Sequence, residues 1–247
     1  NAKIKKIMLN GNKVTMDKSN NDLLKLDFSN LKIKPATPLE LVFDYTLPLQ
    51  ITNKKIEPFF ISSADNFYPR PARNGKNDFR VTFNIKVETP EKLNVVSQGE
   101  KLSDFVKNSN RTVIWRENKP QEEIILIADH YQVFTARHQS ISLYAYLHDN
   151  DKALAKKYFK ATRSYIDLYS KLIAPYPYKK FALVENSKQT GYGMPSFALL
   201  GSRIIRFPFI LQTSYPHEIL HNWFGNGVYV SPDSGNWAEG LTTYLAD

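Results

Sequence analysis

The spacing of apolar residues changes near residue 150, and this change limits the folds open to the chain. Before that point apolar and polar side chains alternate, most clearly over residues 79–88, FRVTFNIKVE. Such alternation is typical of a β-strand with one buried face. From Asp151 onward apolar residues recur every three or four positions, as in an amphipathic helix. The sequence therefore predicts an α+β fold, with an antiparallel, sandwich-like β part followed by a mixed α+β part.

Further segments of the first half also predict strands. Alternation marks residues 39–47, and shorter β-rich runs cover 93–96, 112–115, 123–128, 131–135 and 141–147. Asn10-Gly11 between apolar segments is typical of a tight hairpin turn. Many short strands separated by turns favour a sandwich, so we place a first domain at 1–136 and a second at 137–247.

The second half predicts a long helix and then mixed elements. Asn150 or Asp151 caps the helix, and the prolines at 175 and 177 end it. A strand at 181–185, a glycine-containing loop, a strand-like segment at 197–200 and a helix around His217 follow. Residues 240–247 have the pattern of a helix still in progress, so we expect a C-terminal part of the protein to be missing here.

Composition excludes several classes of protein. Cysteine is absent, which excludes disulfides, thiol catalysis and thiolate metal sites. No apolar run approaches the roughly 18 residues that span a bilayer. The formal charge is +9, but the lysines are scattered, which favours a solvated basic surface over a nucleic-acid partner. We expect a soluble domain, and the start at Asn1 fits an exported or envelope-associated protein whose signal or anchor has been removed.

The segment 216–226, PHEILHNWFGN, carries the chemistry. In a helix His217 and His221 project from one face a turn apart, so both imidazoles can reach one ion at about 2.1 Å. Glu218 lies beside the first histidine, where its carboxylate can take a proton from an activated water. The alternative is an ordinary helix with incidental histidines, although a chance HExxH occurs in roughly one in a hundred chains of this length.

Two histidines do not complete a zinc site, and Glu239 is the natural third ligand. It lies in GNWAEG at 235–240, early in a second predicted helix and after a loop long enough to turn the chain back. Two histidines and a glutamate form an open hydrolytic site, so we expect one Zn²⁺ per chain. Asn226 and Trp223 are expected to pack around the zinc helix. Thr243 is placed to orient Glu239, with a plain helix-surface position as the alternative.

These residues resemble the gluzincin metallopeptidase family of aminopeptidase N and the leukotriene hydrolase. In that family HExxHxWxGN precedes an N-E-G turn, here HEILHNWFGN at 217–226 and NWAEG at 236–240. GYGMPSFALL at 191–200 sits where the family has GxMENWGLI, and Phe67-Tyr68-Pro69 resembles a turn in its β domain. The resemblance implies a β domain leading into a thermolysin-like catalytic domain. It also implies substrate contacts from Tyr192, Gly193, Met194 and Pro195.

The chain departs from the family pattern in three ways. The loop between His221 and Glu239 is one residue shorter. Pro195 replaces the glutamate that pairs with the free α-amine of the substrate, which puts aminopeptidase specificity in doubt. The family's transition-state tyrosine would lie beyond Asp247, so we interpret the chain as a divergent member truncated after the third ligand.

The leading hypothesis is a zinc-dependent hydrolase of peptides or proteins, with Glu218 as the general base and exo- or endopeptidase action left open. The alternative is a zinc-binding relative that no longer cleaves and whose β domain is an interaction module. Oligomeric state and compartment stay open. The remaining histidines, His130, His138 and His148, have no partners at ligand spacing and are expected to be structural.

Overall fold

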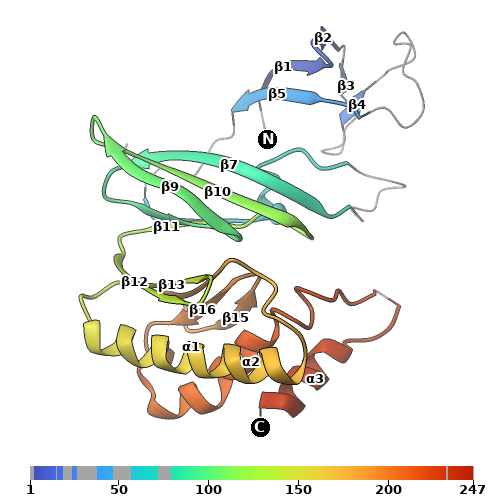
Figure 1. The fold of residues 1–247 in the computed structure, drawn as a ribbon. Coiled ribbons are helices and arrows are strands. Elements are labelled where there is room, and N and C mark those ends of the chain that lie inside the picture. The colour runs from blue at the N-terminus through green and yellow to red at the C-terminus, as the bar shows by residue number, and fades with distance from the viewer. Residues whose placement is uncertain are drawn as a thin grey trace.

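A computed structural model gives the structure of the chain. It describes residues 3–14, 16–18, 24–26, 38–46, 57–71, 79–231 and 233–246. Figure 1 shows antiparallel strands stacked in layers towards the N-terminus, above a second part in which helices pack against a sheet. The fold class is therefore α+β with a β-rich N-terminal part, as predicted. Within the described residues no helix is both long and apolar enough to cross a bilayer.

The outermost strands form two small sheets. One has the order β2-β1-β5, from β1 (Lys3–Leu9), β2 (Asn12–Lys13) and β5 (Leu41–Thr46); the other pairs β3 (Met16–Lys18) with β4 (Leu24–Leu26). The predicted hairpin turn is confirmed, because Asn10 and Gly11 have φ of 47° and 79° and Leu9 pairs with Asn12.

Two further antiparallel sheets face each other across a core that contains Trp115 and Val113. One has the order β7-β10-β9, from β7 (Val81–Pro90), β9 (Glu100–Lys107) and β10 (Asn110–Gln121). The other has the order β6-β11-β8, from β6 (Phe59–Ile61), β8 (Asn94–Val96) and β11 (Leu126–Asp129), with a short helix η1 (Ser63–Asp65) after β6. Burial alternates along β7, as predicted.

The strand β9 has no counterpart among the predicted elements. Its apolar residues Leu102, Phe105 and Val106 are all more than 40% exposed, so they do not alternate with buried positions. Its pairing with β10 defines it instead, through backbone hydrogen bonds that leave no trace in apolar periodicity.

The second part is built on a five-stranded sheet of order β12-β13-β14-β16-β15. Its strands are β12 (Gln132–His138), β13 (Ile141–Leu147), β14 (Lys180–Asn186), β15 (Gly191–Met194) and β16 (Phe197–Gly201). The three central strands are parallel, and both outer strands pair antiparallel. β12 belongs wholly to this sheet, although the predicted domain boundary at 136/137 crosses it. β15 is an edge strand where the sequence predicted a loop.

Both faces of this sheet are buried, which explains the nearly continuous apolar runs of its central strands. One face packs on β8 and β11 through Val184 and Leu199. The other packs on α1 (Lys152–Leu172), which begins after Asp151, whose carboxylate accepts the Leu154 N–H at 2.8 Å. Short helices η2 (Ile204–Arg206) and η3 (Pro208–Gln212) then lead to α2 (Ser214–Leu220) and, after a loop, to α3 (Trp237–Ala246).

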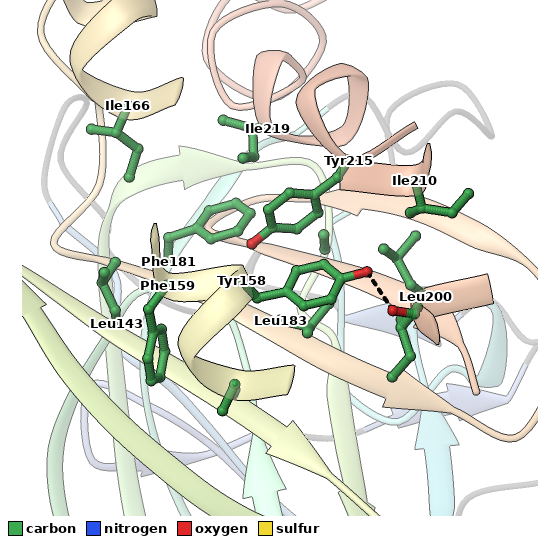
Figure 2. Close-up of a cluster of buried hydrophobic side chains, with 14 of the residues drawn as sticks. Leu143, Tyr158, Phe159, Ile166, Phe181, Leu183, Leu200, Ile210, Tyr215 and Ile219 are labelled. Atoms are coloured by element: carbon green, nitrogen blue, oxygen red, sulfur yellow. Dashed lines mark hydrogen bonds between the residues drawn. The ribbon is translucent and has the colours of Figure 1, made fainter. Parts of the chain in front are cut away.

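The core under α1 also fixes the start of α2 (Figure 2). Tyr215 is fully buried, its ring meets Tyr158 edge to face at 4.7 Å, and its hydroxyl lies 2.6 Å from that of Thr162 on α1. Tyr158 in turn donates to the carbonyl of Ile205. Because Tyr215 stands two residues before His217, this packing sets where the first histidine leaves the helix.

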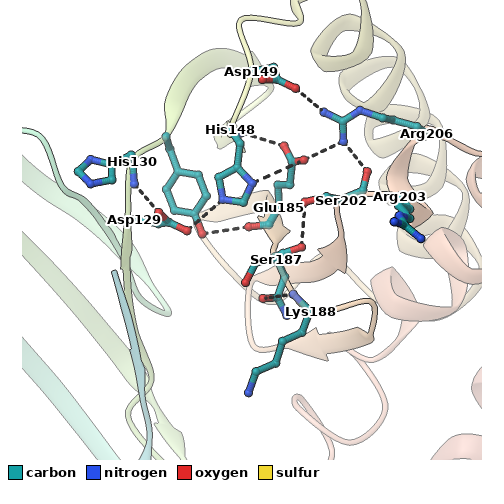
Figure 3. Close-up of polar contacts among 12 residues, drawn as sticks. Asp129, His130, His148, Asp149, Glu185, Ser187, Lys188, Ser202, Arg203 and Arg206 are labelled. Carbon is teal, nitrogen blue, oxygen red and sulfur yellow. Dashed lines mark hydrogen bonds and ion pairs between the residues drawn. The ribbon is translucent and has the colours of Figure 1, made fainter. Parts of the chain in front are cut away.

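A polar network joins the two parts where β11, β13 and β14 end (Figure 3). Nε2 of His148 lies 3.0 Å from Oδ2 of Asp129, and the His148 backbone N–H donates to Oε2 of Glu185 at 2.8 Å. Arg206 donates to Oε1 of Glu185 at 2.7 Å and pairs with Asp149. Burial alone would raise the pKa of Glu185, but these hydrogen bonds outweigh it and hold the pKa below its usual value.

We expect Glu185→Gln to destabilise the fold by about 2–3 kcal/mol at pH 7, because an amide NH₂ group replaces one of the two buried oxygens that accept from Arg206 and the His148 N–H, and the negative charge is lost. A carboxylate with a lowered folded pKa stabilises above its unfolded pKa, about 4.3, and loses that contribution as pH falls through the folded value. The difference between wild type and variant should therefore shrink as pH drops below about 4. Urea unfolding at several pH values measures it. The exposed Glu122→Gln is the control, and a pH-independent difference would contradict the assignment.

Candidate metal centre

The segment SYPHEIL forms α2 and contains His217. His221 follows directly after it, and the two histidines lie on one face. Pro216 lies in the first turn, where its missing N–H costs nothing. His221 follows the last helical residue but keeps helical angles, and its N–H donates to the His217 carbonyl at 3.3 Å. The two Nε2 atoms consequently lie 3.1 Å apart, with the imidazole rings at 85° to each other.

Glu239 reaches the same point from α3. One carboxylate oxygen lies 3.2 Å from Nε2 of His217, and the other lies 3.4 Å from Nε2 of His221. The start of α3 packs against the protein. Trp237 lies edge to face on Phe224, and Ala238 is buried. The loop that is one residue shorter than in the family thus still brings the third side chain to the histidines.

Thr242, which the sequence reasoning did not single out, lies on the buried side of this helix. Its buried hydroxyl donates to the carbonyls of Ala238 and Glu239 at 2.9 and 3.0 Å. Thr243, the residue chosen from the sequence, is exposed on α3 and does not line the cavity. A buried threonine one position away was indistinguishable by spacing, because both lie about one turn from Glu239.

The three side chains fit a zinc ion. Ligands at 2.0–2.1 Å from a tetrahedral ion stand about 3.3 Å apart, close to the 3.1–3.4 Å between these donor atoms. Nδ1 of His221 lies 3.1 Å from the Phe224 carbonyl, which accepts its proton and leaves the lone pair on Nε2. Burial lowers the pKa of His221, which favours the neutral imidazole that a metal needs.

Glu218 lies beside these residues and points into the same cavity, of about 370 Å³. Its side chain is largely buried, and burial together with the negative charge of Glu239 raises its pKa to about 7. The cavity is lined by Gly191, Tyr192, Gly193, Met194, His217, Glu218, His221, Gly225, Asn226, Val230, Asn236, Ala238 and Glu239. A carboxylate with a pKa near neutrality is suited to proton transfer.

The edge strand β15 forms one wall of the cavity and lies unusually close to α2. A Cβ at Gly193 would stand 2.9 Å from Oε2 of Glu218 and 2.9 Å from Cβ of His221, so only glycine fits. Asn226 donates from Nδ2 to the Gly193 carbonyl at 2.8 Å, and Tyr178 donates to the Asn226 carbonyl. Asn226 thus ties the strand to the metal-bearing segment.

The other predicted residues are distributed around this wall. Tyr192 is half-exposed and Met194 half-buried, and both line the cavity. Pro195 is half-buried in the turn after β15 and is not among the lining residues. Trp223 packs behind the site, where its Nε1 donates to the Ala174 carbonyl. His130, His138 and His148 all lie away from the cavity, and the last two pair with Asp167 and Asp129.

Comparison with known proteins extends this picture at the level of the fold. No sequence-family model and no curated protein sequence matches the chain. Solved structures match in shape, among them an M1 zinc metallopeptidase from Deinococcus radiodurans with a TM-score of 0.72 at 16% identity. The fold is that of M1 zinc metallopeptidases. That match covers 99% of this chain and 60% of the Deinococcus chain, so this chain spans about 60% of the length of that protein.

Two more matches agree. An E323A mutant from Deinococcus radiodurans bound to a Tyr-Ser-Ala substrate has a TM-score of 0.69 at 16% identity, over 99% of this chain and 60% of that one. Native yeast LTA4 hydrolase has a TM-score of 0.60 at 15% identity, over 91% of this chain and 38% of that one. The predicted order, a β domain followed by an α+β domain, is therefore confirmed for the fold.

We expect the purified chain to hold about one zinc per molecule, and His217→Ala, His221→Ala or Glu239→Ala to lose it. Loss of an outer partner of a ligand costs about 10–100-fold in affinity, so loss of a ligand itself should cost more. Elemental analysis after dialysis gives the zinc-to-protein ratio. His138→Ala, which removes a histidine paired with Asp167 instead, should keep its zinc. Full zinc retention in all three ligand variants would contradict the assignment.

Proposed function

We propose that the chain carries the active site of a zinc-dependent peptide hydrolase. The observation that carries this proposal is the convergence of three metal-ligand atoms and the buried carboxylate of Glu218 in one cavity beside an edge strand. A zinc ion held there supplies Lewis-acid chemistry, by which a substrate carbonyl is polarised and a water molecule is activated.

The chain's own side chains divide the remaining work. Nε2 of His217, Nε2 of His221 and the Glu239 carboxylate hold the ion. The Glu218 carboxylate, on the adjoining wall of the cavity, accepts the proton of the attacking water and returns it to the leaving amine. Burial suits Glu218 to both tasks, because a raised pKa makes it a better base and leaves its acid form accessible.

An extended peptide is the ligand that the cavity wall favours. β15 is an edge strand, and an extended peptide adds to such an edge through backbone hydrogen bonds. The Asn226 amide keeps the strand at its distance from α2. The Tyr-Ser-Ala substrate of the Deinococcus mutant supports a peptide ligand for a site on this fold.

We further propose that this site does not require a free α-amine. Among the described residues that line the cavity, only Glu218 and Glu239 carry a carboxylate, and both have other tasks. Pro195, at the position where the related enzymes have a glutamate, offers neither charge nor N–H. Among the described lining residues, a substrate ammonium group therefore has no dedicated partner.

Glu218→Gln should lower kcat for peptide cleavage by about 10²–10⁴-fold, because the amide cannot take the proton. Zinc content should stay unchanged, since the three ligands remain. Steady-state cleavage of a peptide library by the zinc-loaded protein, with the exposed Glu91→Gln as a surface control, measures this. Undiminished cleavage by Glu218→Gln would refute the proposed role. Zinc binding without any cleavage by the full-length wild-type protein would favour the non-cleaving interaction module.

Blocking the substrate's N-terminus tests the second proposal. We expect kcat/KM for matched peptides with free and acetylated N-termini to agree within about tenfold, or 1.4 kcal/mol, because no buried ion pair with the amine is lost. Mass spectrometry of the products gives both the rates and the bond cleaved. Cleavage confined to the free peptides, one residue from the N-terminus, would show an aminopeptidase despite Pro195.

A further inference from the structure

Lys180 is a fully buried lysine at the boundary between the β part and the metal-bearing part. Lys180 is the first residue of β14, and its Nζ lies 5.2 Å from the ring centre of Trp115 and 5.3 Å from that of Phe197. Burial lowers its pKa to about 7, against the opposing attraction of Glu117. Lysine is almost never fully buried without a specific partner, so the Lys180 ammonium group needs polar partners inside the protein.

The partner of Lys180 is Ser196, in the turn between β15 and β16. Nζ donates to Oγ of Ser196 at 2.7 Å and to its carbonyl at 3.2 Å. The Gly99 N–H, from the β part, donates to the same Oγ at 3.0 Å. Ser196 has φ of 68°, a left-handed conformation that costs a non-glycine residue about 1–2 kcal/mol, so these bonds hold the turn in a shape it would otherwise leave.

The same serine is tied to the metal-bearing segment. Its N–H donates at 2.8 Å to Oδ1 of Asn222, the residue directly after His221. Asn222 is itself fixed, because its Nδ2 donates to the Ile219 carbonyl at 2.8 Å. Ser196 therefore connects the end of β15 to α2, and Met194, two residues earlier, lines the cavity.

We propose that Lys180 is a positioning residue that, through Ser196, sets the edge strand β15 at the spacing from the metal centre that an extended peptide needs. This inference rests on the proposed function, because it concerns how the same site takes a peptide. β15 is held near its middle by Asn226 and at its end by the Ser196 turn. Without Nζ, Ser196 loses two of its hydrogen bonds, and the turn can relax and carry Met194 with it.

Among the described residues, the Lys180 side chain contacts none of the three candidate ligands. An effect on the strand β15 can therefore be separated from an effect on the metal. Within the described residues the Lys180 ammonium group donates hydrogen bonds to Ser196 alone, whereas His217, His221 and Glu239 are arranged by α2 and α3. Removing the ammonium group should weaken ligands that lie along β15 and spare ligands that need only the metal. A general loss of structure would weaken both kinds.

The test uses Lys180→Met in the zinc-loaded chain, with the exposed neighbour Lys179→Met as the matched control. Calorimetry compares a tripeptide hydroxamate, which extends along β15, with acetohydroxamic acid, which needs only the metal. Loss of hydrogen bonds that position the strand should weaken the tripeptide ligand by about tenfold and the small ligand by less than about twofold. Lys179→Met should leave both affinities unchanged.

A second variant covers the case in which Lys180→Met does not fold. Ser196→Gly keeps the left-handed backbone and deletes Oγ, so it should show the same ligand-selective loss. Equal weakening of both ligands, or an unchanged tripeptide affinity, overturns the inference. So does a wild-type chain that binds the tripeptide ligand no more tightly than acetohydroxamic acid. None of these readouts needs cleavage, so absence of activity would count against the proposed function alone.

Discussion

The close contact between α2 and the edge strand β15 is the constraint on which the site depends. At Gly193 the strand passes so near to Glu218 and His221 that a single added carbon would collide with both. This contact puts the carboxylate, the histidines and the free edge of the sheet into one cavity. A hydrolytic centre for peptides needs those groups within a few ångströms of one another, and here the close backbone packing at Gly193 brings them together.

The β part takes a direct share in holding this arrangement. Gly99 reaches the turn after β15, and Asp129 pairs with His148 at the end of β13. In the loop between α2 and α3, the Tyr229 hydroxyl donates to the Pro120 carbonyl, and its ring stacks on Arg80 at 3.9 Å. The segment that carries the chain from His221 to Glu239 is thus anchored on the β part, so both parts contribute to the candidate metal centre.

The elements predicted from the sequence are those whose signal is local. β7 alternates because one of its faces is buried, and α1 begins at Asp151 because a short carboxylate caps it. β9 and β15 were missed because pairing with a neighbouring strand defines them, and GYGM has little intrinsic preference for a strand. Lys180 is visible in the sequence as a charged residue at the start of the apolar run KFALV. That run does not indicate that Ser196 is its partner.

The sequence by itself placed the candidate ligands His217 and His221 and the carboxylate of Glu218, because the geometry of one helix sets their spacing whatever surrounds them. It also indicated Glu239 as the third ligand, through its position after a loop of suitable length. Only the tertiary structure decided which residues lie beside those side chains: Asn226 bonds to Gly193, and Ser196 lies between Lys180 and Asn222. These contacts join residues far apart in the chain, and their partners are chosen by packing, which no local spacing encodes.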